Sequence, residues 1–326
     1  MSWVKVDCGN AGSSAKLPAR SNRERAARAP VTPIEDHSLD QSSWSFPSVV
    51  VGGVKVACVS RRELAEIMVA DCMAARNTPR SPKLIFDANG HGLSLAATNS
   101  HYRGSLGEAD LIHADSQAIV AASRLLTSAP IPERSATTDF FHDAAKRASE
   151  AGLRFFLLGG PKNMTDQCAQ VLQADYEGLQ IVGRRNGYFA ETEERAICDE
   201  INASQADVVW VGLGKPREQQ FCVRNRHRLT AGWLVTCGGC FGFVTGQYPR
   251  APGWMQRAGF EWLHRLVTNP RRLFWRYLKT NPHALFLIAM RTRIQPVEMR
   301  FCVSHGADTD RASAPPGTIK YRTSWG

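Results

Sequence analysis

The sequence has no long apolar run. Its longest uninterrupted apolar stretch, Ala284–Met290, is far shorter than the roughly 18 to 20 residues that cross a bilayer. No charged segment followed by an apolar one opens the chain, so we expect neither a membrane-spanning nor a secreted protein. GxGxxG, Walker A, GxSxG and HExxH patterns are also missing, which removes the sequence support for the standard dinucleotide, NTPase, hydrolase and zinc-protease sites.

The cysteines follow no disulfide pattern. They are nine in number, an odd count, and have no repeating interval, which favours reduced thiols. Cys237 and Cys240 have a spacing seen in metal and redox sites, but no second pair of ligands follows them. We interpret them as small residues that close a buried strand, and we predict no metal ligands in the chain.

The positive charge lies at the ends of the chain. Of 326 residues 43% are hydrophobic, enough for a folded protein, and the net charge is +10. Residues 250–300 contain ten basic and two acidic residues, whereas 31–249 are nearly neutral. This asymmetry indicates an anionic partner. Aromatic residues among the cations of 250–300 favour an anionic membrane surface, unless they only pack on the core. No nucleic-acid-binding motif is present, so we do not expect nucleic acid.

Residues 48–59 predict a hairpin with its turn at Gly52–Gly53. After it, short apolar runs alternate with helical patterns, which predicts βαβ crossovers. We therefore expect an α/β fold with a Rossmann-like, mostly parallel sheet and helices on both faces. Beyond Arg250 the patterns are helical only and predict helices over 254–267, 270–279 and 283–293, with Pro270 and Pro282 opening the last two. The expected parts are a flexible basic leader (1–45), an α/β core (46–249), a basic helical appendage (250–300) and a flexible tail (301–326).

Polar residues and glycines follow the predicted strands, where parallel sheets bind ligands. A nucleotide diphosphate can be held there by backbone N–H groups at helix N-termini, without a P-loop. The segments are Asp87–Asn89, Ala114–Ser116, Gly159–Gly160, Gly212–Gly214 and Gly238–Gly239.

A series of motifs resembles one known family, the WecG/TagA/CpsF glycosyltransferases, over about residues 50 to 295. The motifs are Ala109–Asp115, Pro132–Arg134 with Thr138–Asp139, Leu157–Gly160, Gly187–Phe189, Val211–Gln219, Gly238–Phe241 and Arg250–Arg257. The resemblance implies inverting transfer of a sugar, usually from a UDP-sugar, to a polyprenyl-diphosphate-linked saccharide. It also implies a peripheral protein on the cytoplasmic face of the bacterial inner membrane. A homo-oligomer is compatible with the sequence, which does not fix the oligomeric state.

Asp115 matches the catalytic aspartate proposed for the family, and its predicted place at a strand end suits a base. The alternative is an aspartate that caps the helix beginning near Ser116, where the family usually has glycine. Asn89 matches the family's Thr-Leu-Asn segment, but Asp87 replaces the threonine. Asp87 and Asp115 together could bind a divalent metal. The family is generally regarded as metal-independent, so we expect no required cofactor and regard Mg²⁺ as unlikely.

The resemblance assigns the remaining site residues to the donor and to the diphosphate. The donor set consists of Asp87, Asn89, Arg134, Thr138, Asp139, Gly159, Gly160, Gly214 and Gln219. Arg134 could bind a phosphate, Asp139 could cap a helix, and Gln219 could bind donor hydroxyls or simply start an exposed helix. Arg265, Arg272 and Arg276 would clamp the acceptor diphosphate, with a solvated or lipid-facing charge run as the alternative.

We therefore predict a hexose-transferring enzyme of exopolysaccharide or cell-envelope polysaccharide synthesis. An N-acetylmannosaminyl-type transferase of the same family is the first alternative. A non-catalytic membrane-surface scaffold is the second, supported by the departures at Asp87 and Ser116. A nucleotide-sugar dehydrogenase or epimerase would need a dinucleotide fingerprint, and the sequence contains none.

Overall fold

The computed structural model describes residues 43–302 except 79, 295 and 296, and leaves out the side chains of 43–45, 272 and 297–302. The predicted leader and tail lie largely outside this range. The strands are β1 Ser43–Val51, β2 Val54–Ala57, β3 Lys83–Ala88, β4 Leu111–Ala114, β5 Arg154–Gly159, β6 Gln180–Arg185, β7 Val208–Gly212, β8 Trp233–Thr236 and β9 Val297–Cys302. The helices are α1 Arg61–Asn77, α2 Gly90–Thr98, α3 Ser100–Gly107, α4 Gln117–Leu126, α5 Thr137–Ala151, α6 Lys162–Asp175, α7 Glu194–Ala203, α8 Arg217–Asn225, α9 Cys240–Val244, α10 Gly253–Arg257, α11 Glu261–Thr268 and α12 Pro270–Arg291.

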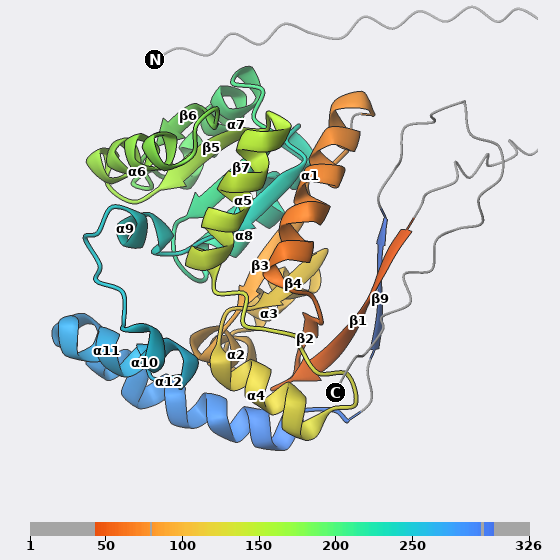
Figure 1. Ribbon diagram of the computed structural model, residues 1–326, viewed down its shortest axis with the longest axis vertical. Coiled ribbons are helices and arrows are strands. Elements are labelled where there is room, and N and C mark those ends of the chain that lie inside the picture. Colours follow the sequence, from red (N-terminus) through yellow and green to blue (C-terminus); the bar gives the residue numbers. More distant parts are fainter. Residues whose placement is uncertain (1–42, 79, 295–296, 303–326) are drawn as a thin grey trace, which may run out of the picture. The chain divides into compact units, whose positions relative to one another are not determined.

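A six-stranded parallel sheet forms the centre of the fold (Figure 1). Its strand order is β4-β3-β8-β7-β5-β6, and every pairing in it is parallel. Between β4 and β5 the chain crosses to the other half of the sheet, which creates a topological switch point. The predicted α/β class with a mostly parallel sheet is confirmed.

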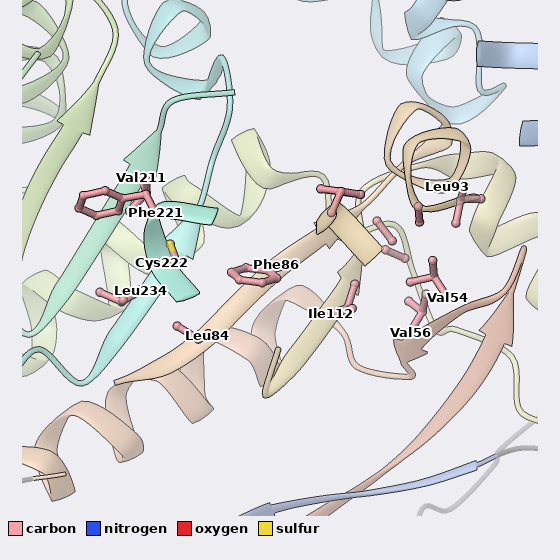
Figure 2. Packing of buried hydrophobic residues seen from close by; sticks show 14 of the residues in the cluster. Val54, Val56, Leu84, Phe86, Leu93, Ile112, Val211, Phe221, Cys222 and Leu234 are labelled. Carbon is pink, nitrogen blue, oxygen red and sulfur yellow. The ribbon is translucent and has the colours of Figure 1, made fainter. Parts of the chain in front are cut away.

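Helices cover both faces of this sheet because its strands carry apolar residues on both sides. Trp210 of β7 belongs to the core beneath α1, α5 and α6, whereas Val209 and Val211 belong to the core on the opposite face. Figure 2 shows part of this second core, including Leu84 and Phe86 of β3 and Phe221 of α8. Burial on both faces makes the sheet a rigid support for the loops at its carboxyl edge.

A second, antiparallel sheet has the order β2-β1-β9. Gly52 and Gly53 form the turn between β1 and β2, both with positive φ, as the predicted hairpin requires. Strand β9 pairs with β1 from Ser43 to Ser48. Residues 43–45 and 301–302, which the sequence reading assigned to the leader and the tail, therefore form strands.

The appendage is divided differently from the sequence prediction. One helix was expected over 254–267, but Gly259, with φ +79°, lies in a turn that separates α10 from α11. One helix was expected before Pro282 and another after it, but α12 continues through this proline. Pro282 and Leu278, four residues earlier, are both exposed. The carbonyl of Leu278, which loses its amide partner, therefore lies on the exposed side of the helix, where water can replace that partner.

Candidate active site

Asp115 comes directly after β4, at the carboxyl edge of the sheet. Its backbone N–H donates to the carbonyl of Ala88 at 2.9 Å, which continues the pairing of β4 with β3. Its carboxylate accepts hydrogen bonds from the Thr137 backbone N–H at 2.9 Å and from Asn89 Nδ2 at 3.1 Å. The N-cap of α4 is Ser116, and no side chain caps this helix. The half-buried carboxylate of Asp115 is thus oriented by α5 and Asn89 rather than by the helix that follows it.

Asn89 connects two strand ends. It is the N-cap of α2, and its Oδ1 accepts a hydrogen bond from the Gly92 N–H at 3.0 Å. Its Nδ2 donates to Asp87 Oδ2 at 2.9 Å and to Asp115 Oδ2 at 3.1 Å. The three polar residues that the sequence placed at this edge are therefore joined through one amide group.

Lys215 is a charged residue of this cluster that the sequence reading did not single out. Its ammonium group contacts Asp87 Oδ1 and lies 3.7 Å from Glu218 Oε1. Thr236 Oγ1 also donates to Asp87 Oδ1, at 3.3 Å. The side chains of Lys215 and Asp87 are only 7% and 5% exposed, so solvent screens their attraction little.

This pairing bears on the possible metal. The ammonium group of Lys215 stands at Asp87, where a divalent ion shared with Asp115 would need a free carboxylate. No group of three or more His, Cys, Asp or Glu residues suited to a metal occurs in the described part of the chain. The residues around Asp87 and Asp115 do not fit a bound Mg²⁺.

The pKa of Asp115 lies below its ordinary value. Burial alone would raise this pKa, but the charge of Arg134 and the hydrogen bonds from Thr137 and Asn89 lower it, as does the charge of Lys215. The carboxylate is therefore ionised at neutral pH and able to accept a proton.

Glu218 ties together the turns that follow β7 and β8. Its Oε2 accepts hydrogen bonds from the N–H groups of Gly214 at 2.9 Å and Gly238 at 3.0 Å. Burial raises its pKa to about 7, although Lys215 acts in the opposite direction. Gln219 is fully buried and donates to Glu218 Oε1 at 3.3 Å. Gln219 therefore faces the interior and does not form the exposed helix start considered from the sequence.

Arg134 joins Asp115 to the appendage. Its Nε donates to the backbone carbonyl of Asp115 at 3.0 Å, and its Nη2 lies 2.5 Å from Glu261 Oε2 of α11. The guanidinium thus lies beside the predicted base and is already paired with a carboxylate. A phosphate reaching this position would have to compete with Glu261.

Thr138 and Asp139 lie in the first turn of α5, whose N-cap is Ala136. The sequence suggested Asp139 as the cap of this helix, but the N-cap position belongs to Ala136. Asp139 pairs instead with Arg250 at 2.9 Å and lies 3.7 Å from Arg61. Thr138 lies beside Cys240 of α9 and lowers the pKa of its thiol, although burial raises that pKa overall. Both residues fasten α5 to neighbouring segments in this structure.

The Gly159–Gly160 turn lies against the end of β7. Gly159 has φ +146°, and a Cβ built on it would stand 2.3 Å from the carbonyl oxygen of Gly212. Gly160 has φ +60°, and its carbonyl accepts a hydrogen bond from the Gly187 N–H at 2.8 Å. Glycine is required at position 159 because two backbone segments meet there.

The three predicted diphosphate arginines occupy different places. Arg276 of α12 lies near His91 of α2, whose pKa falls to about 4 through burial and through the charges of Arg276 and Lys215. Its Nε is buried without a hydrogen-bond partner among the described residues. The guanidinium of Arg265 lies 5.0 Å from the centroid of the Phe243 ring. Arg272 belongs to α12, but its side chain lies outside the description.

Several buried polar atoms near Asp115, or near Lys215 and Glu218, have no partner within the described ranges. They are Nε2 of His113, the hydroxyl oxygens of Tyr102 and Thr137, and Oε1 of Gln219. His113 Nδ1 lies 2.8 Å from the Ser135 carbonyl oxygen, so Nδ1 carries the proton and Nε2 is an acceptor in the neutral ring. Buried polar atoms without partners are costly, and bound ligands or water commonly satisfy them.

A different pocket, of about 520 Å³, opens beside the edge strand β6. Its lining includes Arg184 and Arg185, which pair with Asp166 and Glu200 respectively. None of the predicted site residues lines it. Its arginines are already neutralised by neighbouring carboxylates, so the chemistry of the strand ends remains the stronger candidate.

Comparison with known proteins gives a family match over most of the chain. The profile described as Glycosyl transferase WecG/TagA/CpsF family matches residues 49–298. An N-acetylglucosaminyldiphosphoundecaprenol N-acetyl-beta-D-mannosaminyltransferase from Bacillus spizizenii is 33% identical over 187 residues, which make up 57% of this chain and 71% of the relative. The protein of the same name from Bacillus subtilis is 29% identical over 187 residues, with the same shares of 57% and 71%.

Proposed function

Because this chain belongs to the WecG/TagA/CpsF family of glycosyltransferases, we propose that it transfers one sugar from a UDP-sugar to a polyprenyl-diphosphate-linked saccharide. Membership confirms the resemblance seen in the sequence and the enzyme class. The observation that carries the reaction is the Asp115 carboxylate, held at the strand ends by Asn89 and Thr137. It is ionised and half-buried, and two residues beside it, His113 and Thr137, carry buried polar atoms without partners among the described residues.

In the proposed reaction a hydroxyl of the acceptor attacks the anomeric carbon of the donor. Asp115 takes the hydroxyl proton, the new C–O bond forms, and the bond to the UDP diphosphate breaks with its electron pair remaining on the phosphate oxygen. Attack opposite the leaving diphosphate inverts the anomeric configuration. The reaction is balanced without a metal or a redox partner.

The diphosphate groups need positive charge or N–H donors. Arg276 is suited to this because it lies near the first turn of α2, where backbone N–H groups and the helix dipole favour an anion. Arg134 lies next to Asp115 and would exchange Glu261 for a phosphate. We place the leaving diphosphate of the donor near Arg134 and the acceptor diphosphate near Arg276.

The donor sugar proposed here is of the N-acetylmannosamine type. Both Bacillus relatives are named as N-acetyl-beta-D-mannosaminyltransferases that act on N-acetylglucosaminyldiphosphoundecaprenol. The names of these relatives favour N-acetylmannosamine as the donor sugar over the hexose of exopolysaccharide synthesis, which was the first prediction from the sequence. The hexose remains the second candidate, because relatives that share 33% and 29% identity with this chain can differ from it in donor sugar.

We place the protein at the cytoplasmic face of the inner membrane, held there by its appendage. No described helix is both long and apolar enough to cross a bilayer. The outer side of α10–α12 nevertheless exposes many large apolar side chains, mixed with cations such as Arg257 and Lys279. The exposed apolar residues there are Trp254, Trp262, Leu263, Val267, Phe274, Trp275, Leu278, Leu285, Phe286 and Met290. An apolar surface with basic residues fits an anionic bilayer, which also carries the lipid-linked acceptor.

A transfer assay tests the proposal. Labelled UDP-N-acetylmannosamine, UDP-glucose and UDP-N-acetylglucosamine are each offered with polyprenyl-diphosphate-N-acetylglucosamine and with polyprenyl-diphosphate-glucose. We expect transfer from UDP-N-acetylmannosamine, and a loss of about 100-fold to 10,000-fold in Asp115→Asn at an unchanged melting temperature. Asp175→Asn, in the last turn of α6, is the matched control and should keep full activity. Equal rates for wild type and Asp115→Asn would overturn the role of the base, and no transfer with any pair would favour the scaffold.

A further inference from the structure

Four polar side chains form a continuous chain of contacts that ends at the proposed base, Asp115. Glu218 lies 3.7 Å from Lys215, Lys215 contacts Asp87, Asp87 accepts from Asn89, and Asn89 donates to Asp115. These residues come from the ends of β3, β4 and β7. Lys215 and Asp87 are almost entirely buried, whereas Asp115 is partly exposed. The chain therefore runs from the interior of the protein to the site of proton transfer.

The amide of Asn89 has a single favourable orientation in this arrangement. Its Oδ1 is used by the Gly92 N–H, and Nδ2 donates to one carboxylate on each side. If Oδ1 and Nδ2 of Asn89 changed places, Oδ1 would face the carboxylates of Asp87 and Asp115. Three acceptor oxygens would then lie together without a proton between them. Asp87 therefore fixes the direction in which Asn89 presents its N–H to Asp115.

Lys215 makes this use of Asp87 possible. A buried carboxylate without a cation would be costly to keep ionised, and the ammonium group of Lys215 compensates its charge. Thr236 supplies a further hydrogen bond to the same oxygen, Oδ1, which leaves Oδ2 for Asn89. Both oxygens of Asp87 are thus engaged within the protein.

We infer that Asp87 and Lys215 are positioning residues, which orient the base Asp115 through Asn89 instead of contacting the donor or a metal. This inference rests on the proposed function, in which Asp115 removes the acceptor proton. It reassigns Asp87, which the sequence analysis placed in the donor site. It also gives Lys215 a role that neither the motif nor the comparisons supply.

Charged and titratable groups from several elements interact with Asp115. Arg134 before α5 and Lys215 after β7 lower its pKa. Burial lowers the pKa of His113 of β4 and raises that of Cys240 of α9, and the charge of Asp115 acts to raise both. Asp87 of β3 is joined to Asp115 through Asn89. Removal of the Lys215 cation raises the pKa of Asp115, since Lys215 is among the groups that lower it. Removal of the Asp87 anion acts in the opposite direction, because a nearby negative charge disfavours ionisation.

The test compares pH profiles of kcat/KM for wild type, Lys215→Met and Asp87→Asn. We expect kcat to fall about 10-fold to 100-fold in Lys215→Met, as for a misplaced catalytic group, with little change in the donor KM. The acidic limb of the profile should move to higher pH in Lys215→Met and to lower pH in Asp87→Asn. Lys215→Arg keeps the charge and should restore the limb to the wild-type position.

Lys83→Met is the matched control. Lys83 is the first residue of β3, at the end of the strand opposite to Asp87, and it also pairs with an aspartate: it lies 3.5 Å from Asp110. This variant should keep the wild-type profile. A raised donor KM with an unmoved acidic limb in Asp87→Asn would show that Asp87 contacts substrate. If kcat fell in Lys215→Met while both limbs stayed in place, the role would be structural only.

A second measurement does not depend on turnover. In protein labelled with ¹³C at the aspartate carboxyls, the signal of Asp115 is assigned from its loss in Asp115→Asn and titrated in each variant. The same opposite shifts are expected without any substrate. Absence of both shifts in a transferring enzyme would overturn this inference alone, whereas shifts in a protein that transfers no sugar would overturn only the proposed function. If Lys215→Met does not fold, Asp87→Asn carries both measurements.

Discussion

The double substitution Trp275→Ser and Phe286→Ser tests whether α12 holds the protein on a membrane. The two side chains are 66% and 60% exposed. With about 200 Å² for an aromatic side chain, they offer about 250 Å² for insertion. At about 25 cal/mol per Å² complete burial would contribute about 6 kcal/mol. A helix in the interface inserts only its outer part, so we take about half, or about 3 kcal/mol. Binding to vesicles should therefore weaken about 100-fold.

The assay is sedimentation with vesicles of phosphatidylcholine and phosphatidylglycerol in equal parts, over a range of lipid concentrations. Tyr188→Ser is the control, because Tyr188 is 76% exposed but lies in the loop after β6. It should bind like wild type. Added salt should weaken binding further, since cations of the appendage contribute about 1 kcal/mol each near an anionic surface. Binding of the double variant within about threefold of wild type would refute the reasoning, because that difference is under 1 kcal/mol.

Three further results are expected. Asp207→Ala should lower the free energy of unfolding by about 2 to 3 kcal/mol in denaturant melts, because the buried Asp207 accepts charge-assisted hydrogen bonds from Arg76 and Arg154. Burial alone would raise the pKa of Asp207, but these arginines hold it below its ordinary value. The stabilisation is therefore complete above the unfolded pKa of about 3.9 and is lost as the pH falls through the lower folded value. Gly159→Ala should cost about 3 kcal/mol or prevent folding, measured by thermal melting, because its Cβ has no space. EDTA should leave the transfer rate unchanged, because the carboxylate of Asp87 is already paired with an ammonium group.

The sequence predicted the parts of this fold that depend on local pattern. Alternating apolar runs and helical segments led to the parallel sheet, and Gly52 and Gly53 marked the first hairpin correctly. Pro282 was misread because proline was taken to start a helix, whereas an exposed position inside α12 tolerates it. Strand β9 was missed because it pairs with β1, about 250 residues earlier, and such pairing leaves no local signal.

The sequence predicted those parts of the candidate site that lie at the ends of predicted strands. Asp87, Asn89 and Asp115 were expected together because each follows a strand and parallel strands end at one edge. The partner of Asp87 was not predictable in this way. Lys215 lies 128 residues further along the chain. It reaches Asp87 because β7 lies near β3 in the sheet, with only β8 between them. The sequence offered two separate signals, a lysine directly after Gly214 and an aspartate at position 87 where the family has threonine. The strand order was needed to bring the two together.

The electrostatics of the site suit a base that is activated by its substrates. Arg134 and Lys215 hold the pKa of Asp115 below its ordinary value, so the free carboxylate is ionised but a weak base. In the proposed reaction the donor diphosphate approaches Arg134 and adds negative charge beside Asp115. That charge raises the pKa of Asp115, because a nearby anion disfavours the ionised carboxylate. Lys215 is buried and remains paired with Asp87, so it continues to keep the carboxylate deprotonated. Substrate binding thus strengthens the base while the internal ion pair preserves its charge.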